Sequence, residues 1–158
     1  MRIIIFTIVL LTSFHAKAQD VLVWEGRGDS FSNQILNVNQ GYLLPERENM
    51  WSDAYYTIVE NRIYEGFSSS FFDLKFTVRD GQLFMGDSQF RGDILYTLKN
   101  GQIFTGDSDL LMDVLFTFKR GQLFEGSGMS SFDVLYTIDG NPTAAELYAI
   151  IIALGLLN

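Results

Sequence analysis

A period of twenty residues runs through most of the chain, and it constrains the fold more than any other feature. An aspartate opens each copy, a threonine follows four positions later, and a glycine comes nine positions after the threonine. The members of these series are Asp53, Asp73, Asp93, Asp113 and Asp133; Thr57, Thr77, Thr97, Thr117 and Thr137; and Gly66, Gly86, Gly106 and Gly126. Self-similarity at a fixed spacing is typical of repeat architectures, in which each copy is one structural unit.

Each copy has the pattern of a β-hairpin followed by a loop. Apolar residues alternate with other residues on both sides of Asn100-Gly101, which is strand periodicity. Asn-Gly is a strong hairpin signal because both residues accept positive φ in a tight turn. In such a hairpin Leu98 faces Ile103 across the two strands.

Half copies at both ends complete the array. Residues 24–26 match residues 64–66 at two full periods, so the array opens on the second strand of a hairpin. Residues 133–138 end it on a first strand, and the copies between them bring the total to about twelve strands. The last strand can then pair with the first, which removes both exposed edges. The expected fold is mainly β, a closed antiparallel barrel of about twelve strands.

The tail departs from this period and predicts a helix. Residues 147–157 are apolar apart from one glycine, and a helix that is apolar on all sides must be buried. Its start has two alternatives. Asn141 is the N-cap with Pro142 at the first helical position, or Thr143 and Glu146 form a capping box.

A ring of twelve strands has room for that helix. Strands spaced ~4.8 Å apart and tilted ~40° give a radius of about 12 Å. A helix is ~10–12 Å across and packs with its axis ~10 Å from neighbouring backbone. A helix of about 15 residues would be ~22 Å long. Residues 141–158 are therefore expected to plug the barrel formed by residues 19–140, within one domain.

Strict alternation assigns side chains to two faces of each hairpin. The residues expected to face the helix in one copy are Ile94, Tyr96, Leu98 and Ile103. Thr105 would share this face, yet its equivalents are Glu65 and Glu125. Either this position lies at the rim of the barrel or the two faces are inverted.

The opposite face supplies candidate surface contacts. Its apolar positions are Phe84, Phe104, Phe124, Leu95, Leu115 and Leu135. Exposed apolar patches mark sites for partners or membranes. The alternative is that long loops, such as those containing residues 71–72 and 110–112, fold over these positions and cover them.

The repeated aspartates do not predict a metal site. Equivalent residues in neighbouring copies lie two strands apart, roughly 9–10 Å. Ligands of one Ca²⁺ must each lie ~2.3–2.6 Å from it. Each aspartate is instead expected to accept hydrogen bonds within its own loop, for example near Ser88 or Ser108. We predict no metal and no cofactor.

The first eighteen residues have the pattern of a secretory signal peptide. Arg2 precedes an apolar run, and Ala16-Lys17-Ala18 offers small residues for cleavage before Gln19. The predicted location is secreted, periplasmic or in the cell envelope. The mature chain would carry a net charge of about −10, which argues against nucleic acid as a partner. The sequence contains no cysteine, so a disulfide framework is excluded.

Catalysis lacks its usual parts. The one histidine, His15, belongs to the predicted leader, and no nucleophile motif stands out from the repeat. The prediction is that the protein is not an enzyme, with a hydrolase that uses acidic residues as the remote alternative.

Residues 81–87, 101–107 and 121–127 share the pattern G-Q-[LI]-F-x-G-[DS]. This pattern resembles the bacterial β-flower proteins, in which hairpin petals surround a shallow barrel. The overall plan is also similar to the tubby C-terminal domain, a twelve-stranded barrel threaded by a C-terminal apolar helix. Residues 142–150 resemble the start of that helix. Tubby-like proteins bind phosphoinositides through basic residues, for which this acidic chain has no counterpart. The β-flower resemblance implies no established activity.

Two functional hypotheses follow. The first is an exported, non-enzymatic scaffold that binds a protein partner or an apolar ligand through the barrel face or rims. The second is a peripheral tubby-like protein that makes weak membrane contact through apolar loop tips in place of charge.

Overall fold

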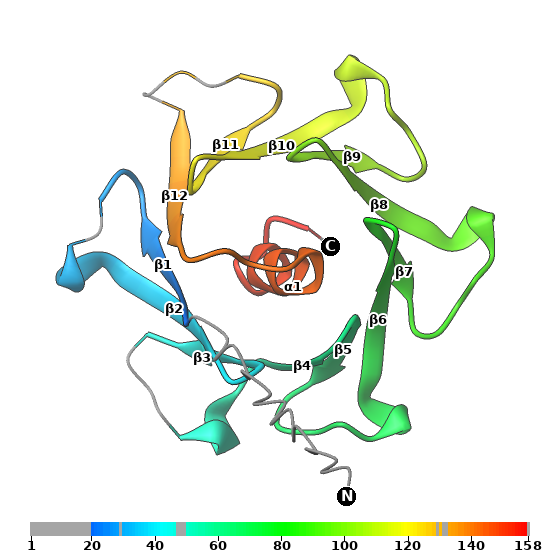
Figure 1. The fold of residues 1–158 in the computed structure, drawn as a ribbon, viewed down its shortest axis with the longest axis horizontal. Coiled ribbons are helices and arrows are strands. Elements are labelled where there is room, and N and C mark those ends of the chain that lie inside the picture. Colours follow the sequence, from blue (N-terminus) through cyan, green and yellow to red (C-terminus); the bar gives the residue numbers. More distant parts are fainter. Residues whose placement is uncertain (1–19, 29, 47–49, 129, 131–132, 158) are drawn as a thin grey trace, which may run out of the picture.

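The structure is a closed antiparallel barrel of twelve strands around one C-terminal helix, as the repeat predicts (Figure 1). The computed structural model describes residues 20–28, 30–46, 50–128, 130 and 133–157, so the predicted leader lies outside the described residues. The strands are β1 (Val21–Glu25), β2 (Gln34–Asn39), β3 (Tyr42–Pro45), β4 (Tyr56–Val59), β5 (Arg62–Glu65), β6 (Leu74–Arg79), β7 (Gln82–Met85), β8 (Ile94–Lys99), β9 (Gln102–Thr105), β10 (Val114–Lys119), β11 (Gln122–Glu125) and β12 (Val134–Asp139).

Pairing of the two half copies closes the ring. Strand β1 pairs antiparallel with β12, with Trp24 opposite Thr137, and β1 pairs with β2 on its other side. Strands β12 and β1 therefore act as a sixth hairpin whose two strands come from opposite ends of the fold. Closure leaves no strand edge unpaired within the barrel.

The hairpins have the register that their turns predict. Asn100 and Gly101 both have positive φ, +54° and +77°, as a tight primed turn requires. Across this turn Leu98 pairs with Ile103, and Thr97 pairs with Phe104. The turn sequence therefore sets which side chains share a face.

A β-bulge in the first strand of most hairpins overturns part of the face assignment. Leu83 pairs with Tyr96 but the next residue, Phe84, pairs with Ile94, so Leu95 has no partner across β7. The extra residue breaks the alternation. The expectation that Ile94 faces the helix and Leu95 faces outward was therefore wrong. The leucines that pack against the inner core are Leu95, Leu115 and Leu135.

Thr105 lies at the rim of the barrel, which explains why its equivalents in other copies can be charged. Thr105 pairs with Tyr96 at the end of the hairpin and is exposed, as are its equivalents Glu65 and Glu125. Apart from the residues at the bulge, the side chains predicted to face the helix therefore do face it. The polar position is tolerated because the barrel ends there.

The helix α1 (Ala144–Ala153) fills the centre of the ring (Figure 1). Its start follows the second alternative. Glu146 N–H donates to the hydroxyl of Thr143 at 3.2 Å, and Thr143 N–H donates to the Glu146 carboxylate at 2.7 Å. The helix is ten residues long, shorter than the expected 15, because Gly155 takes φ +69°. Leu156 N–H then bonds to the carbonyl of Ile151, which is a Schellman ending.

The core forms where the plug meets the second strands of the hairpins. Tyr148, Ala149, Ile150 and Ile151 of α1 have no solvent exposure. The completely buried residues that the hairpins contribute at equivalent positions are Leu43, Ile63, Leu83, Ile103 and Leu123. Burial of a side chain of this size contributes roughly 1.5–3 kcal/mol, so a fold without disulfides has enough apolar burial to be stable.

Candidate functional site

Six outer connections join successive hairpins, and we call each of them a petal. A petal runs from the end of a second strand to the start of the next first strand, as in residues 86–93 (Figure 1). Where the sequence predicts a plain loop, the described residues of five petals contain a one-turn 3₁₀ helix. These helices are η1 (Phe31–Asn33), η2 (Trp51–Asp53), η3 (Phe71–Asp73), η4 (Arg91–Asp93) and η5 (Leu111–Asp113).

The repeated threonines tie each petal to its hairpin. The hydroxyl of Thr117 donates to the carbonyl of Gly126 at 2.7 Å. The same bond, between 2.6 and 2.8 Å, joins Thr57 to Gly66, Thr77 to Gly86, Thr97 to Gly106 and Thr137 to Gly26. In the degenerate first copy, the amide of Asn37 donates to the carbonyl of Glu46. Six equivalent positions therefore serve the fold.

The repeated aspartates brace the petals from inside. Asp113 accepts a hydrogen bond from the Ser108 hydroxyl at 2.5 Å, and that hydroxyl oxygen accepts from the backbone N–H of Leu110. The pairs Ser88–Asp93 and Ser68–Asp73 repeat the bond. This confirms that these aspartates bond within their own loops. Within the described residues, no group of three or more His, Cys, Asp or Glu side chains is arranged to hold a metal.

The six predicted surface contacts are not exposed patches. Phe84 is only 5% exposed, and Phe104 and Phe124 are buried as well. The guanidinium of Arg79 lies over the Phe84 ring, 5.8 Å from its centroid, and also bonds to Ser88 and Asp87 of the petal. The phenylalanines are therefore buried and the leucines pack inward, but Arg79 covers Phe84, and residues 71–72 and 110–112, which were expected to cover these positions, are themselves exposed.

Exposed apolar side chains lie instead on the petals. Phe72 in η3 is 94% exposed, and Met112 in η5 is 86% exposed. The other large apolar residues exposed on petals, which with these two we call the petal tips, are Met50, Trp51, Phe67, Phe71, Phe90, Leu110 and Leu111. The loops predicted to cover the barrel therefore present apolar surface of their own.

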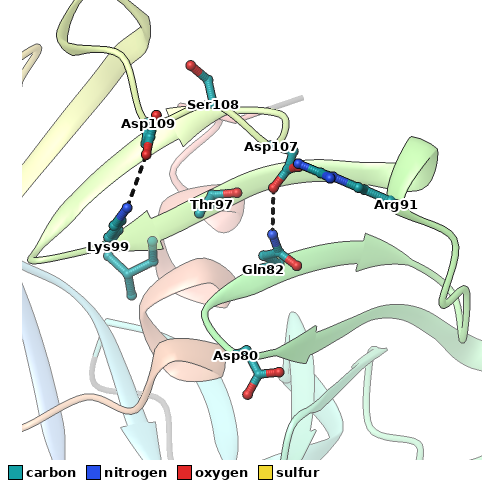
Figure 2. A pocket seen from close by; sticks show the side chains of 9 residues that line it. Asp80, Gln82, Arg91, Thr97, Lys99, Asp107, Ser108 and Asp109 are labelled. Atoms are coloured by element: carbon teal, nitrogen blue, oxygen red, sulfur yellow. Dashed lines mark hydrogen bonds and ion pairs between the residues drawn. The ribbon is translucent and has the colours of Figure 1, made fainter.

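Some of the hollows on the described surface lie between neighbouring petals. Figure 2 shows the one between the petals of residues 86–93 and 106–113, with a volume of about 450 Å³. In this groove, which we call the polar groove, Asp107 accepts from Gln82 Nε2 at 2.8 Å and from Arg91 Nε. Lys99 Nζ lies 3.1 Å from Asp109.

Both cationic side chains that line the polar groove are paired with carboxylates, and Asp80 adds a third acidic group to the lining. Arg91 is paired with Asp107, and Lys99 is paired with Asp109. Ser108 also lines it, but its hydroxyl hydrogen is donated to the petal's own Asp113. The arrangement therefore suits polar contacts and offers no nucleophile beside a free base.

A groove two periods earlier replaces this polar set with aromatic rings. Gln82, Arg91 and Asp107 correspond, forty residues back, to Tyr42, Trp51 and Phe67. The three rings pack together, with centroid separations of 5.7 Å for Tyr42–Trp51, 5.2 Å for Tyr42–Phe67 and 6.5 Å for Trp51–Phe67. We call this the aromatic groove. The lining residues of its cavity are Tyr42, Thr57, Val59, Phe67, Ser68 and Ser69.

The sequence predictions did not include these three aromatic residues. They occupy three different positions of the repeat, and nothing in one copy brings them together. In the polar groove, Arg91 and Asp107 come 9 and 25 residues after Gln82. The same offsets counted from Tyr42 lead to Trp51 and Phe67 and would have grouped the three aromatic residues. The signal in the sequence was that these positions, which vary between copies, are polar in one copy and aromatic in another.

At the rim, Lys75 lies 2.7 Å from Glu65. This hydrogen bond, together with the charge of Glu65, raises the pKa of Lys75 above its ordinary value. Burial, and then Glu65, raises the pKa of Tyr56. Both shifts favour protonated side chains, so this cluster is suited to holding the rim together and not to accepting protons.

Comparison with known proteins gives one match. The model of a family described as 6-fold beta flower protein matches residues 23–152, which cover the barrel and nearly all of α1. No curated protein and no solved structure matches the chain significantly. Among the helices that the structure describes, none combines the length and hydropathy that a membrane crossing needs.

Proposed function

The chain belongs to the 6-fold beta flower proteins, and we propose that it is an exported, non-enzymatic binding module. In this proposal, the barrel and its plug are a rigid support. Contacts with a protein partner or an apolar ligand are made by the grooves between petals and by the petal tips.

One observation carries the proposal. The threonine, serine and aspartate positions make the same hydrogen bonds in copy after copy. At the groove positions, by contrast, a hydrogen-bonded Gln82–Arg91–Asp107 set stands where another copy has Tyr42, Trp51 and Phe67. The positions that make the same bonds in successive copies hold the fold. The positions whose side chains change from polar to aromatic between copies are the ones that we assign to binding.

The composition supports a module that works without catalysis. No cysteine is present, and the only histidine lies in the predicted leader. The acidic side chains of the petals accept hydrogen bonds from serines or pair with cations. The serine oxygens of these pairs also accept a backbone N–H of the petal, so the pairs hold the loop and do not present a free nucleophile.

Export is the part of the proposal that the first eighteen residues support. Expression of the full chain in a bacterium and N-terminal sequencing of the product outside the cytoplasm would test it. We expect a mature chain that begins at Gln19. Recovery of the uncleaved chain from the cytoplasm alone would overturn the export proposal.

Binding is tested with the mature protein immobilised on beads and exposed to a cell-envelope fraction. The proposal predicts a ligand that wild type and Thr105→Val retain and that Trp51→Ala or Phe72→Ser loses. Thr105 is exposed at the rim, is not among the lining residues of the polar or the aromatic groove, and serves as the control. Equal retention by all four proteins would contradict a role for grooves and tips.

The exposure of the petal tips favours a second candidate, peripheral contact with a membrane. Phe72, Phe90 and Met112 lie on successive petals and are the most exposed large apolar side chains described. Such residues can enter the interface of a neutral bilayer, whereas the acidic chain would be repelled by anionic lipid. Flotation with phosphatidylcholine vesicles tests this. Absence of the wild type from the floating fraction would exclude it, and loss on Phe72→Ser with Met112→Ser would support it.

A further inference from the structure

We propose that the aromatic groove binds an uncharged sugar ring, as part of a neutral glycan. The inference rests on the proposed function, because it assigns a ligand class to one of the grooves. It is carried by the orientation of the rings, by the absence of charge among the described lining residues, and by the size of the cavity.

The three rings have similar orientations. The plane of Trp51 makes angles of 23° with Tyr42 and 17° with Phe67, and Tyr42 and Phe67 differ by 40°. A cage for a quaternary ammonium group needs rings that face it from several sides. Near-parallel rings give a staggered flat surface, which suits the flat face of another ring.

Trp51 and Phe67 both expose ring surface, Phe67 within the lining of the cavity and Trp51 packed against the lining residues Tyr42 and Phe67. They are 49% and 53% exposed, although aromatic side chains of this size usually bury most of their area. The negative face of an aromatic ring attracts the slightly positive hydrogens of C–H bonds. A pyranose ring presents a row of such hydrogens on one face and hydroxyl groups at its edge.

Among the residues that the structure describes, those that line the aromatic groove carry no charge. Tyrosine, threonine, valine, phenylalanine and two serines line it. The polar groove, at the equivalent place, holds two ion pairs. A charged ligand would have to give up its hydration here without a compensating charge, so the groove favours a neutral one. A nucleobase could stack on the rings, but its phosphates would be repelled by the acidic chain.

The size of the cavity and the hydroxyl groups at its edge restrict the class of ligand further. The cavity has a volume of about 190 Å³. Drug-sized ligands occupy cavities of about 300–1,000 Å³, so this groove suits a single ring of a longer chain. Ser69 is exposed at its edge, where its hydroxyl can exchange hydrogen bonds with sugar hydroxyls.

Tryptophan fluorescence gives a direct readout. The chain has two tryptophans. Trp24 is buried at 5% exposure, whereas Trp51 is half-exposed and packs against two lining residues of the aromatic groove, Tyr42 and Phe67. The mature protein is titrated with cellotetraose, chitotetraose, maltotetraose and mannotetraose. We expect at least one of them to change the emission of Trp51, with calorimetry giving one site per chain.

Three variants locate the site. Trp51→Ala should weaken binding by about tenfold or more, as loss of a central aromatic contact does, and Trp51→Phe should retain most of it. Arg91→Ala removes the residue at the equivalent position of the polar groove and should leave the affinity unchanged. Thermal melting of all three proteins shows whether each variant is folded.

The outcomes separate the inference from the proposed function. Binding that Arg91→Ala weakens as much as Trp51→Ala would place the glycan elsewhere and overturn the inference. No response to any of the four sugars, together with Trp51-dependent binding of an apolar peptide, would also overturn it, while the binding-module proposal would stand. Failure of both the sugars and the envelope-fraction capture would remove both proposals.

Discussion

The hydroxyl of Tyr148, in the middle of α1, donates a hydrogen bond of 2.9 Å to the backbone carbonyl of Gly81 in the turn between β6 and β7. The same carbonyl accepts the N–H of Leu98 from β8 at 2.8 Å. One oxygen atom therefore joins the plug, a hairpin turn and the next hairpin. Tyr148 is completely buried, so the bond is shielded from water.

Substitution Tyr148→Phe tests this link. The free energy of unfolding should fall by about 1 kcal/mol, because the Gly81 carbonyl keeps its bond to Leu98 and is not left unpaired. Urea denaturation at pH 7 measures the change. Tyr55→Phe removes a hydroxyl from a half-exposed tyrosine and should have no measurable effect. Equal stability of the two variants would show that the Tyr148 hydroxyl contributes nothing.

The same residue predicts how stability depends on pH. Burial raises the pKa of Tyr148 well above its usual value near 10. A hydrogen bond with the backbone of Leu98 lowers this pKa but only partly offsets the effect of burial. Above about pH 10 the unfolded chain loses this proton while the folded chain retains it. The contribution is therefore fully present below pH 10 and declines at higher pH by up to about 1.4 kcal/mol per unit.

Urea denaturation of wild type and Tyr148→Phe between pH 8 and pH 11.5 tests this prediction. The gap in stability between the two proteins should shrink or change sign above pH 10. A shallower decline should remain in the variant, because the pKa of Tyr56 is raised as well. Parallel curves for the two proteins would contradict a retained proton on Tyr148.

The hairpin turns predict a contrast between two glycines. Gly101 has φ +77°, and a Cβ there would lie 2.6 Å from the carbonyl oxygen of Phe118 in the next hairpin. Gly86 also has positive φ, but a Cβ would meet nothing within 4 Å. Gly86→Ala should cost about 1–2 kcal/mol of unfolding free energy for the backbone conformation alone. Gly101→Ala should cost clearly more, and equal losses would show that the turn yields to the added methyl group.

The repeated threonines predict a second contrast. Thr117→Val keeps the shape of the side chain but leaves the Gly126 carbonyl without the donor at 2.7 Å. Loss of a buried partner costs about 1–3 kcal/mol. Thr105→Val, at the exposed rim, should change stability by no more than about 0.5 kcal/mol. Differential scanning calorimetry of both variants measures the difference, and a destabilised Thr105→Val would reverse the assignment.

Much of the architecture follows from local signals that the copies repeat. The turn at Asn100-Gly101 sets the pairing of Thr97 with Phe104. The half copies at the ends predict that the last strand pairs with the first, and in the structure Trp24 lies opposite Thr137, 113 positions later in the sequence. The Thr143–Glu146 capping box and the apolar run after it predict the plug. These features depend on spacing and turn chemistry, which a sequence displays directly.

Other features depend on geometry between copies. The bulge at Leu95 was missed because Ile94, Leu95 and Tyr96 are all apolar, so an inserted residue leaves no mark on the pattern. The end of α1 at Ala153 depends on the conformation of Gly155 within an apolar run. Sequence alone favours a longer helix there, since glycine is tolerated inside helices at a modest cost.

The candidate site was the least predictable part. Tyr42 lies in a strand, Trp51 in a 3₁₀ helix and Phe67 in the following petal, and only the closed ring brings them together. Conversely, Phe84 appears exposed from alternation, but Arg79 of the same hairpin reaches over it. Positions that vary between copies were better guides to surface chemistry than the positions that define the repeat.

The central claim is that the repeat separates residues that hold the fold from residues that make contacts. The most direct test is the free energy of unfolding of one triple variant, Tyr42→Gln, Trp51→Arg and Phe67→Asp, which gives the aromatic groove the residues of the polar groove. We predict a cooperative urea transition within about 2 kcal/mol of wild type, because half-exposed ring pairs and surface ion pairs each contribute little. A loss of more than about 4 kcal/mol, or failure to fold, would show that these rings belong to the fold and would contradict the account.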